Sequence, residues 1–348
     1  MRDTRSQFRP IDHPNDHFIL TTVVGSYPKP TWLNQARELY HTHSSKDSRE
    51  RYNEAKNDAS SIVIKEHEDA GLDVIVDGEM KRNEMVEYFA ERIRGYEFNG
   101  PVKVWGHNYF DKPSVVEKLS YGEPWLLEEY KYNMKIAEKP IKVPITGPYT
   151  LSNWSFNEFY KDEVELSYEL AELVNKEIKN LVGSGVRYIQ IDEPALATTP
   201  EDHKIVRDCL ERITEGIPDN VRIGLHVCYG DYSRIFPKIL DYPVDEFDVE
   251  LANGNYAQLD VFKKVPFTKD IGFGVIDVHD SRIESVEEVK ERILKGLEIV
   301  PPDRLTVSPD CGLKLLSREV AYKKMVNMVK ATRMVEEELD RGEIEIVE

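Results

Sequence analysis

The chain has 348 residues, of which 40% are hydrophobic and 10% aromatic, and it carries a formal net charge of −18. Its length suits one large globular domain or two ordinary ones. The negative charge argues against nucleic acid and against anionic membranes as partners, because both are themselves negatively charged.

Short apolar runs, most of them rich in valine and isoleucine, recur along the chain between long amphipathic stretches. Most lack clean alternation, which is typical of strands buried on both faces. We expect eight strands, in chain order Phe18–Val24, Asp73–Val76, Ile141–Ile145, Tyr188–Ile191, Arg222–Val227, Glu246–Leu251, Ile271–Val278 and Arg304–Val307. Eight strands that alternate with helices predict an α/β fold, a (β/α)8 TIM barrel. An open doubly wound sheet is the alternative.

Amphipathic helices are expected between most of these strands. They cover Arg49–Ala70, Glu163–Val182, a stretch that begins after Ser285, and Ser317–Leu339. The second of these helices carries an apolar residue at every fourth position and is followed by Gly183, a stop signal. Ser285 followed by Glu288 is the pattern of a capping box.

Three segments fall outside this alternation within a single domain that spans residues 1–348. Residues 1–17 are expected to form an N-terminal arm across the barrel, and residues 336–348 an acidic tail that frays. The long insertion after strand 2, residues 98–139, is rich in aromatic residues. Loops of this length are often lids or binding flaps. A packing excursion that covers the barrel rim is an equally good interpretation.

The cysteine content indicates a reducing compartment. Three cysteines are an odd and low number, which does not make a disulfide framework. The N-terminus lacks the apolar segment of a signal peptide, and no run approaches the ~18 apolar residues of a membrane-spanning helix. We therefore expect a cytoplasmic protein whose thiols serve metal binding or catalysis. Cys209 is the exception, since it lies in a helical stretch where simple packing is expected.

Polar residues stand where the predicted strands end. In a parallel barrel these carboxyl ends share one face, where catalytic groups gather. The strand-end motifs are Val24-Gly25-Ser26, Asp77-Gly78-Glu79, Thr146-Gly147-Pro148 with Asn153-Trp154 beyond it, Asp192-Glu193-Pro194, His226-Val227-Cys228, Glu250, Asp277-Val278-His279 and Cys311.

Four of these residues carry metal-binding side chains. His226 and Cys228 are two residues apart, so they point to the same face of a strand. Glu250 and Cys311 end two other strands, and the four together predict a zinc site. Because four protein ligands usually close a zinc site, a thiol substrate would have to displace one of them or expand the coordination. We expect Glu250 to yield, since a hard oxygen ligand suits a metal that gains sulfur least.

Two further carboxylates need a partner. Glu79 and Asp192 stand near the ends of apolar strands, where a carboxylate requires a cation or a hydrogen-bond donor. Capture of a substrate ammonium group fits as well as a structural role, which would be pairing with a nearby arginine, such as Arg82, or capping of the following helix.

The spacing also leaves the roles of one histidine and one tryptophan open. A packed His279 that is hydrogen-bonded to Asp277 is favoured by spacing alone. Trp154 fits either the protein core or a position against a flat ring of a ligand.

At these motifs the chain resembles the catalytic, C-terminal half of cobalamin-independent methionine synthase, over roughly residues 18–335. The matching stretches follow the family's order. They are Thr22–Ser26, Asp77–Glu79, Arg82–Phe89, Thr146–Pro148, Asn153–Phe156, Ile191–Leu196, His226–Cys228, Glu250, Asp277–His279 and Pro309–Leu313.

The resemblance implies a zinc-dependent methyltransferase that acts on the thiol of L-homocysteine and forms methionine. The implied Zn²⁺ ligands are His226, Cys228, Glu250 and Cys311. Glu79 and Asp192 would hold the ammonium group of homocysteine, and the turn Val24, Gly25, Ser26 its carboxylate. His279, with Asp277 beside it, would be the catalytic acid. Trp154, Arg82 and Asn83 would lie on the methyl-donor side.

The methyl donor is not fixed by the resemblance. Family members that use polyglutamyl methyltetrahydrofolate carry a second, N-terminal barrel, whereas this chain looks like the short, single-barrel form. The expected donors are a methylated corrinoid, free or protein-bound, or a methylated folate or methanopterin. One alternative is an alkyl transferase for another thiol, such as coenzyme M, which has no use for an ammonium pocket. The other is a non-catalytic scaffold stabilised by zinc.

Overall fold

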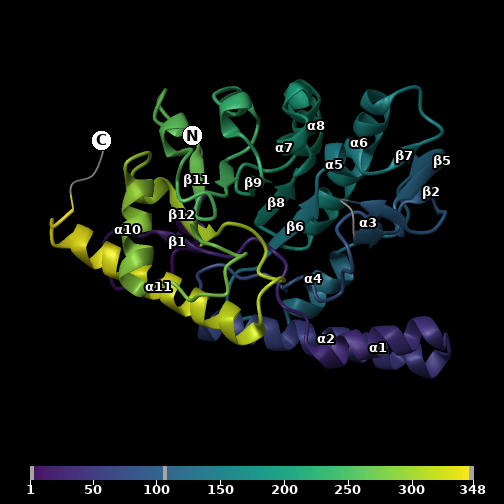
Figure 1. Cartoon of the computed structure of the whole chain (residues 1–348), viewed down its shortest axis with the longest axis horizontal. Coiled ribbons are helices and arrows are strands. Elements are labelled where there is room, and N and C mark those ends of the chain that lie inside the picture. Colours follow the sequence, from purple (N-terminus) through teal and green to yellow (C-terminus); the bar gives the residue numbers. More distant parts are fainter. Residues whose placement is uncertain (1–3, 105–107, 345–348) are drawn as a thin grey trace.

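The structure, a computed structural model, describes residues 4–104 and 108–344 (Figure 1). Its centre is one sheet of seven parallel strands in the spatial order β1, β12, β11, β10, β9, β8, β6. The strands are β1 (Leu20–Thr21), β6 (Lys142–Thr146), β8 (Tyr188–Asp192), β9 (Arg222–Val227), β10 (Glu246–Val249), β11 (Asp270–Ile276) and β12 (Leu305–Pro309). All seven correspond to predicted strands, and the bounds of β9 are those expected.

The eighth predicted strand, residues 73–76, is present only as an isolated parallel bridge between Ile75 and Ile141. The carboxylate of Asp73 accepts the N–H of Thr21 at 2.9 Å and its hydroxyl at 2.7 Å, so a side chain takes the place of a regular ladder. The N–H groups of Asp73 and Val74 donate to the carbonyl of Thr21. Residues 73–76 therefore contact both edge strands of the sheet, which is curled in the manner of a TIM-like barrel.

Helices surround the sheet (Figure 1). They are α1 (Thr31–Thr42), α2 (Lys46–Asp69), α3 (Glu87–Ala90), α4 (Leu127–Asn133), α5 (Pro148–Asn153), α6 (Glu163–Gly183), α7 (Ala195–Thr198), α8 (His203–Thr214), α9 (Leu259–Phe262), α10 (Val286–Leu297) and α11 (Arg318–Asp340). Short 3-10 turns are η1 (Ser6–Phe8), η2 (Pro200–Asp202), η3 (Tyr232–Arg234), η4 (Lys238–Asp241) and η5 (Pro302–Arg304). Within the part of the chain that the structure describes, no helix is long and apolar enough to cross a membrane.

Four helices, α2, α6, α10 and α11, begin at side-chain caps. Ser45, Asp162, Ser285 and Ser317 each accept a backbone N–H three residues later. The expected capping box at Ser285 is half formed: its hydroxyl accepts the N–H of Glu288, but the Glu288 carboxylate pairs with Arg282 and Arg292 instead.

The segment that contains the predicted insertion forms a layer at one end of the molecule (Figure 1). Strands β2 (Arg94–Phe98), β5 (Pro113–Ser120) and β7 (Phe156–Asn157) make a small sheet, and β3 (Val102–Val104) pairs with β4 (Asn108–Phe110). The Glu177 carboxylate on α6 accepts the N–H groups of Trp125 and Leu126, which fastens the segment to the barrel wall. A lid function of residues 98–139 stays a prediction.

The N-terminal segment covers the amino end of the sheet. Phe8 lies against the ring of Tyr188 at 5.5 Å between ring centroids, and the Arg5 guanidinium donates to the Leu305 carbonyl at 2.5 Å. Beneath them, Arg222 pairs with Glu246 and Asp270, each at 2.7 Å. The predicted arm thus closes one end of the barrel over buried charges.

The predicted acidic tail begins inside α11. The carboxylate of Glu336 is buried and accepts the Ile19 N–H at 2.8 Å, and Asp340 accepts the His17 N–H at 2.9 Å. Residues 336–340 are therefore packed helix, because their carboxylates bind the chain that leads into β1. Residues 345–348 lie outside the described residues.

Candidate functional site

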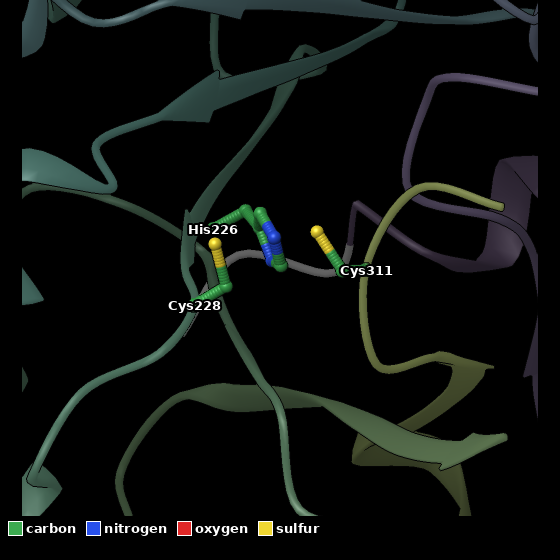
Figure 2. A group of neighbouring side chains, drawn as sticks. All are labelled: His226, Cys228 and Cys311. Carbon is green, nitrogen blue, oxygen red and sulfur yellow. The ribbon is translucent and has the colours of Figure 1, made fainter. Parts of the chain in front are cut away.

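The carboxyl end of the sheet brings three of the four predicted metal ligands together. His226 lies on β9, Cys228 follows that strand directly, and Cys311 follows β12. One ligand atom from each lies within 4.8 Å of the other two. Figure 2 shows the imidazole between the two sulfur atoms. The three side chains form a group that can hold a metal ion.

The surroundings of His226 suit a side chain that binds a metal ion or a proton. The side chain is buried, and neither ring nitrogen has a hydrogen-bond partner among residues 4–104 and 108–344. Buried imidazole nitrogens without a partner are destabilising unless a proton, a ligand or a metal satisfies them. Burial alone would lower the pKa of His226, but the neighbouring Cys311 sulfur raises it to about 9.

The two thiols are polarised in opposite directions. Interaction with Cys228 and with His226 lowers the pKa of Cys311 well below its usual range. The neighbouring Cys311 and burial raise the pKa of Cys228 well above it. One imidazole and two cysteine sulfurs are side chains of the types that bind metal ions in proteins.

Glu250 lies outside this group of three but borders it. Its carboxylate accepts the Tyr229 N–H and the Asn253 side-chain amide, both at 3.0 Å. Burial raises the pKa of Glu250, and it interacts electrostatically with Cys311. The fourth predicted ligand is thus near the sulfur atoms but engaged with protein donors.

Asp310, which the sequence did not single out, connects the end of β12 to the loop that follows β10. It is buried beside Cys311 and accepts three backbone N–H groups of the loop that follows Glu250, those of Leu251, Ala252 and Asn253, at 3.0, 2.9 and 2.6 Å. Its position directly before a predicted ligand was the available signal.

Asp192 is buried close to this group, and Glu79, with 20% of its side chain exposed, is half-buried. Burial raises the pKa of both carboxyls, that of Asp192 to about 7. The nearby Glu79 contributes to the raised pKa of Asp192, whereas Arg82, 3.8 Å from the Glu79 carboxylate, opposes the rise in the pKa of Glu79. Asp192 accepts the Gln190 side-chain amide at 2.7 Å. Two neighbouring carboxyls whose pKa values are raised favour a shared cationic ligand.

Glycines make room for these carboxylates. A Cβ on Gly25 would lie 2.5 Å from the Glu79 carboxylate. A Cβ on Gly147 would lie 2.1 Å from the Glu193 carboxyl carbon. Glu193 passes over Gly147 and accepts the N–H groups of Tyr149 and Thr150, so it caps α5. The motif Asp192-Glu193 therefore divides into one residue that faces the site and one that fixes a helix.

The Val24, Gly25, Ser26 turn lies beside the loop that carries Cys311. The Ser26 carbonyl accepts the Leu313 N–H at 2.7 Å, and a Cβ on Gly312 would collide with the Ser26 hydroxyl. The turn is thus placed at the rim of the same site.

His279 and Asp277 form a pair that reaches the metal-binding group through Tyr229. The Asp277 carboxylate accepts the backbone N–H of His279 at 2.8 Å. The imidazole Nε2 of His279 lies 2.7 Å from the Tyr229 hydroxyl. Tyr229 has a positive φ of 60° and an exposed side chain, and its N–H donates to Glu250. Only its position directly after Cys228 could have pointed to Tyr229 from the sequence.

The three residues expected on the donor side differ in their surroundings. Arg82 is buried, with its guanidinium over the rings of Tyr88 and Phe89. Asn83 accepts the Tyr52 hydroxyl at 3.4 Å. Trp154 is half-buried against the hydrophobic core at the end of α5.

Comparison with known proteins identifies close relatives. The family model of the cobalamin-independent synthase catalytic domain matches residues 19–334. A methionine synthase of Saccharolobus solfataricus is 47% identical over 92% of this chain and 96% of its own. One from Thermococcus kodakarensis is 46% identical over 92% and 94%.

Solved structures of two methyltransferases have the same fold as this chain. A B12-independent methionine synthase from Shewanella sp. W3-18-1, in complex with selenomethionine, superposes with a TM-score of 0.81 at 28% identity, over 92% of this chain and 98% of that one. A methyltransferase from Methanosarcina mazei shares the fold with a TM-score of 0.62 at 14% identity, over 93% and 96%.

Proposed function

The chain belongs to the cobalamin-independent methionine synthase family and is a methyltransferase, and from this premise we propose that it methylates the thiol of L-homocysteine in a zinc-dependent reaction. The observation that carries the proposal is the meeting of His226, Cys228 and Cys311 next to two carboxyls, those of the buried Asp192 and the half-buried Glu79. We assign the curled sheet to a (β/α)8 barrel, with residues 73–76 in the eighth position.

The proposed zinc ligands are His226, Cys228 and Cys311, with Glu250 as the fourth. The unpartnered nitrogens of His226, within the described part of the chain, and the two sulfurs support this set. A bound zinc ion would keep the thiol of homocysteine deprotonated near neutral pH, where a free thiol is mostly protonated. The Tyr229 and Asn253 donors would hold the Glu250 carboxylate whenever the substrate displaces it.

Homocysteine would be oriented by charges at both ends of its amino-acid moiety. We assign its ammonium group to Glu79 and Asp192, because these two carboxyls lie near each other and favour a cation. Its carboxylate would accept from Ser26 in the turn beside Cys311. An ammonium pocket favours homocysteine over coenzyme M, which has no amino group.

Proton delivery to the donor is assigned to His279, oriented by Asp277 and Tyr229. A tertiary amine such as a methylated folate is a poor methyl donor until it is protonated, and a general acid can deliver that proton. Trp154, Arg82 and Asn83 remain assigned to the donor side. The proposed donor is a methylated corrinoid or a methylated folate or methanopterin.

Isothermal calorimetry of the zinc-loaded protein with L-homocysteine tests the acceptor half of the reaction. We expect binding with about one proton released, measured by repeating the titration in buffers of different ionisation enthalpy. Binding of coenzyme M but not of homocysteine would assign the site to the other thiol. A protein that binds neither thiol and unfolds when zinc is removed would be a zinc-stabilised scaffold.

A further inference from the structure

Glu79 is held in a backbone conformation that residues with a side chain rarely adopt. Its φ is 56°, and the preceding Gly78 has a φ of 67°. The Asp77 carboxylate accepts the Glu79 N–H at 2.9 Å. Such a conformation persists only where the surroundings impose it, so the groups that hold Asp77 and Glu79 determine where the Glu79 carboxylate lies.

Asp77 and Arg82, which both contact Glu79, are connected to α4. The second oxygen of Asp77 accepts the Asn133 side-chain amide at 3.1 Å. Arg82 approaches the Glu79 carboxylate at 3.8 Å and is flanked by Tyr88, whose hydroxyl donates to Glu129 at 2.6 Å. Asn133 and Glu129 are one turn apart on α4, a helix within the segment 98–139.

A small cavity lies between these residues. Asp77, Arg82, Glu129 and Asn133 line it, and it leaves ≈ 10 Å³ for the centre of a water-sized sphere, about the space that one water needs. Three of the lining residues carry a buried atom without a hydrogen-bond partner in residues 4–104 and 108–344: Arg82 Nε, Glu129 Oε2 and Asn133 Oδ1. One donor and two acceptors match the two protons and a lone pair of one water molecule.

We propose that α4 is a positioning element for Glu79, acting through Asn133 on Asp77 and through Glu129 and one buried water on Arg82. The inference rests on the proposed function, because it matters only if Glu79 receives the ammonium group of homocysteine. It gives the segment 98–139 a role in substrate selection. In this proposal α4 fixes the position of the Glu79 carboxylate, which distinguishes a thiol with an amino group from a thiol without one.

The test compares two thiols in the zinc-loaded protein: L-homocysteine and 4-mercaptobutyrate, which is homocysteine without its amino group. Asn133→Leu should weaken homocysteine binding about tenfold or more, as expected for a misplaced binding group. Its affinity for 4-mercaptobutyrate and its zinc content should stay unchanged. Glu129→Gln, which keeps the shape of the side chain, is the second variant should Asn133→Leu fail to fold.

Asn175→Leu is the matched control. Asn175 is also a buried amide, but it donates to the carbonyls of Ile213 and Glu215 on the far side of α6. It should lower stability without changing the preference for homocysteine. An equal loss for both thiols in the α4 variants, or an unchanged preference, would overturn the proposal. Failure of the unmodified protein to bind homocysteine would instead refute the proposed function.

The water has a test of its own. In a crystal of the zinc-loaded protein we expect one density peak within hydrogen-bond distance of Arg82 Nε, Glu129 Oε2 and Asn133 Oδ1. A dry cavity, or direct contact among the three side chains, would overturn this part of the proposal.

Discussion

The two ends of strand β9 carry charged or metal-binding side chains in opposite circumstances. At the amino end, Arg222 is fully buried and pairs with Glu246 and Asp270 at 2.7 Å, beneath the N-terminal segment. At the carboxyl end, His226 is equally buried, yet neither ring nitrogen has a partner within the described part of the chain. Only three residues lie between a guanidinium that is paired with carboxylates and an imidazole whose nitrogens have no partner in the described residues.

The difference separates the groups that stabilise the fold from those that bind a ligand. A buried charge must be compensated, either by the protein itself or by something that it binds. The amino end supplies its own counter-charges, so it is complete without a ligand. The carboxyl end leaves nitrogen, sulfur and carboxylate groups that we propose bind a metal and a substrate, at the face where barrel enzymes carry their active sites.

The largest effect is expected from the ligands at the carboxyl end. Cys228→Ser or Cys311→Ser should remove bound zinc and lower methionine formation by more than about 100-fold, because even the outer partners of metal ligands account for that much. Metal analysis and an activity assay measure both. Cys209→Ala is the matched control, since Cys209 is buried in α8 away from the site. Full activity of a ligand variant without metal would contradict the assignment.

At the amino end the expected effect is on stability alone. Arg222→Met should lower the free energy of unfolding by about 3–5 kcal/mol, because it leaves the Glu246 and Asp270 carboxylates buried without their partner. Urea unfolding measures it. Replacing both carboxylates as well, with glutamine and asparagine, should recover part of the loss. No recovery would mean that the arginine stabilises mainly by packing.

The charge pairs at the amino end should also make the stability of the protein depend on pH. Burial alone would raise the pKa of Glu246, but Arg222, together with Thr306 and Tyr188, lowers it to about 2. The folded value is below the unfolded one, so this stabilisation is present above about pH 4.3 and is lost as the pH falls toward 2, by roughly 3 kcal/mol in total. Glu246→Gln should flatten the stability curve in that window. An unchanged slope in the variant would exclude Glu246 as its source.

The smallest effect on turnover is expected for the exposed side chain of Tyr229. Tyr229→Phe removes the hydroxyl that contacts His279 but keeps the N–H that binds Glu250. Loss of one hydrogen bond of about 1 kcal/mol should lower kcat with a folate donor by less than about tenfold and leave zinc content unchanged. Loss of zinc would show that the tyrosine supports the metal site itself.

The sequence predicted the seven strands of the parallel sheet and the end of the sheet at which His226, Cys228 and Cys311 meet, because apolar runs and their polar ends are local patterns. It did not predict that residues 73–76 form only a bridge, since the Asp73 side chain competes with the ladder for Thr21. It could not separate the roles of Asp192 and Glu193, adjacent in sequence, because the second reaches across Gly147 to another helix.

The roles of Tyr229, Asp310 and α4 depend on contacts between segments that are far apart in the chain. Asp310 binds a loop nearly sixty residues earlier, and Asn133 binds Asp77 across a similar separation. Hydrophobic periodicity carries no information about such pairs. The strand-end residues and the resemblance both pointed to the proposed metal ligands, but the hydrogen bonds that hold Glu250 to Tyr229 and Asn253 are visible only in the structure.

Gly147 has a consequence for reading mutational data on this protein. The carboxyl group of Glu193, fixed by hydrogen bonds to α5, occupies the volume in which any Cβ at position 147 would lie. In a saturation scan the position should therefore tolerate no substitution and score like an active-site residue, although its role is steric. A scan scored for both abundance and turnover would separate the two, because Gly147 variants would be lost from the abundance channel, whereas variants of Cys311 would be lost only from turnover.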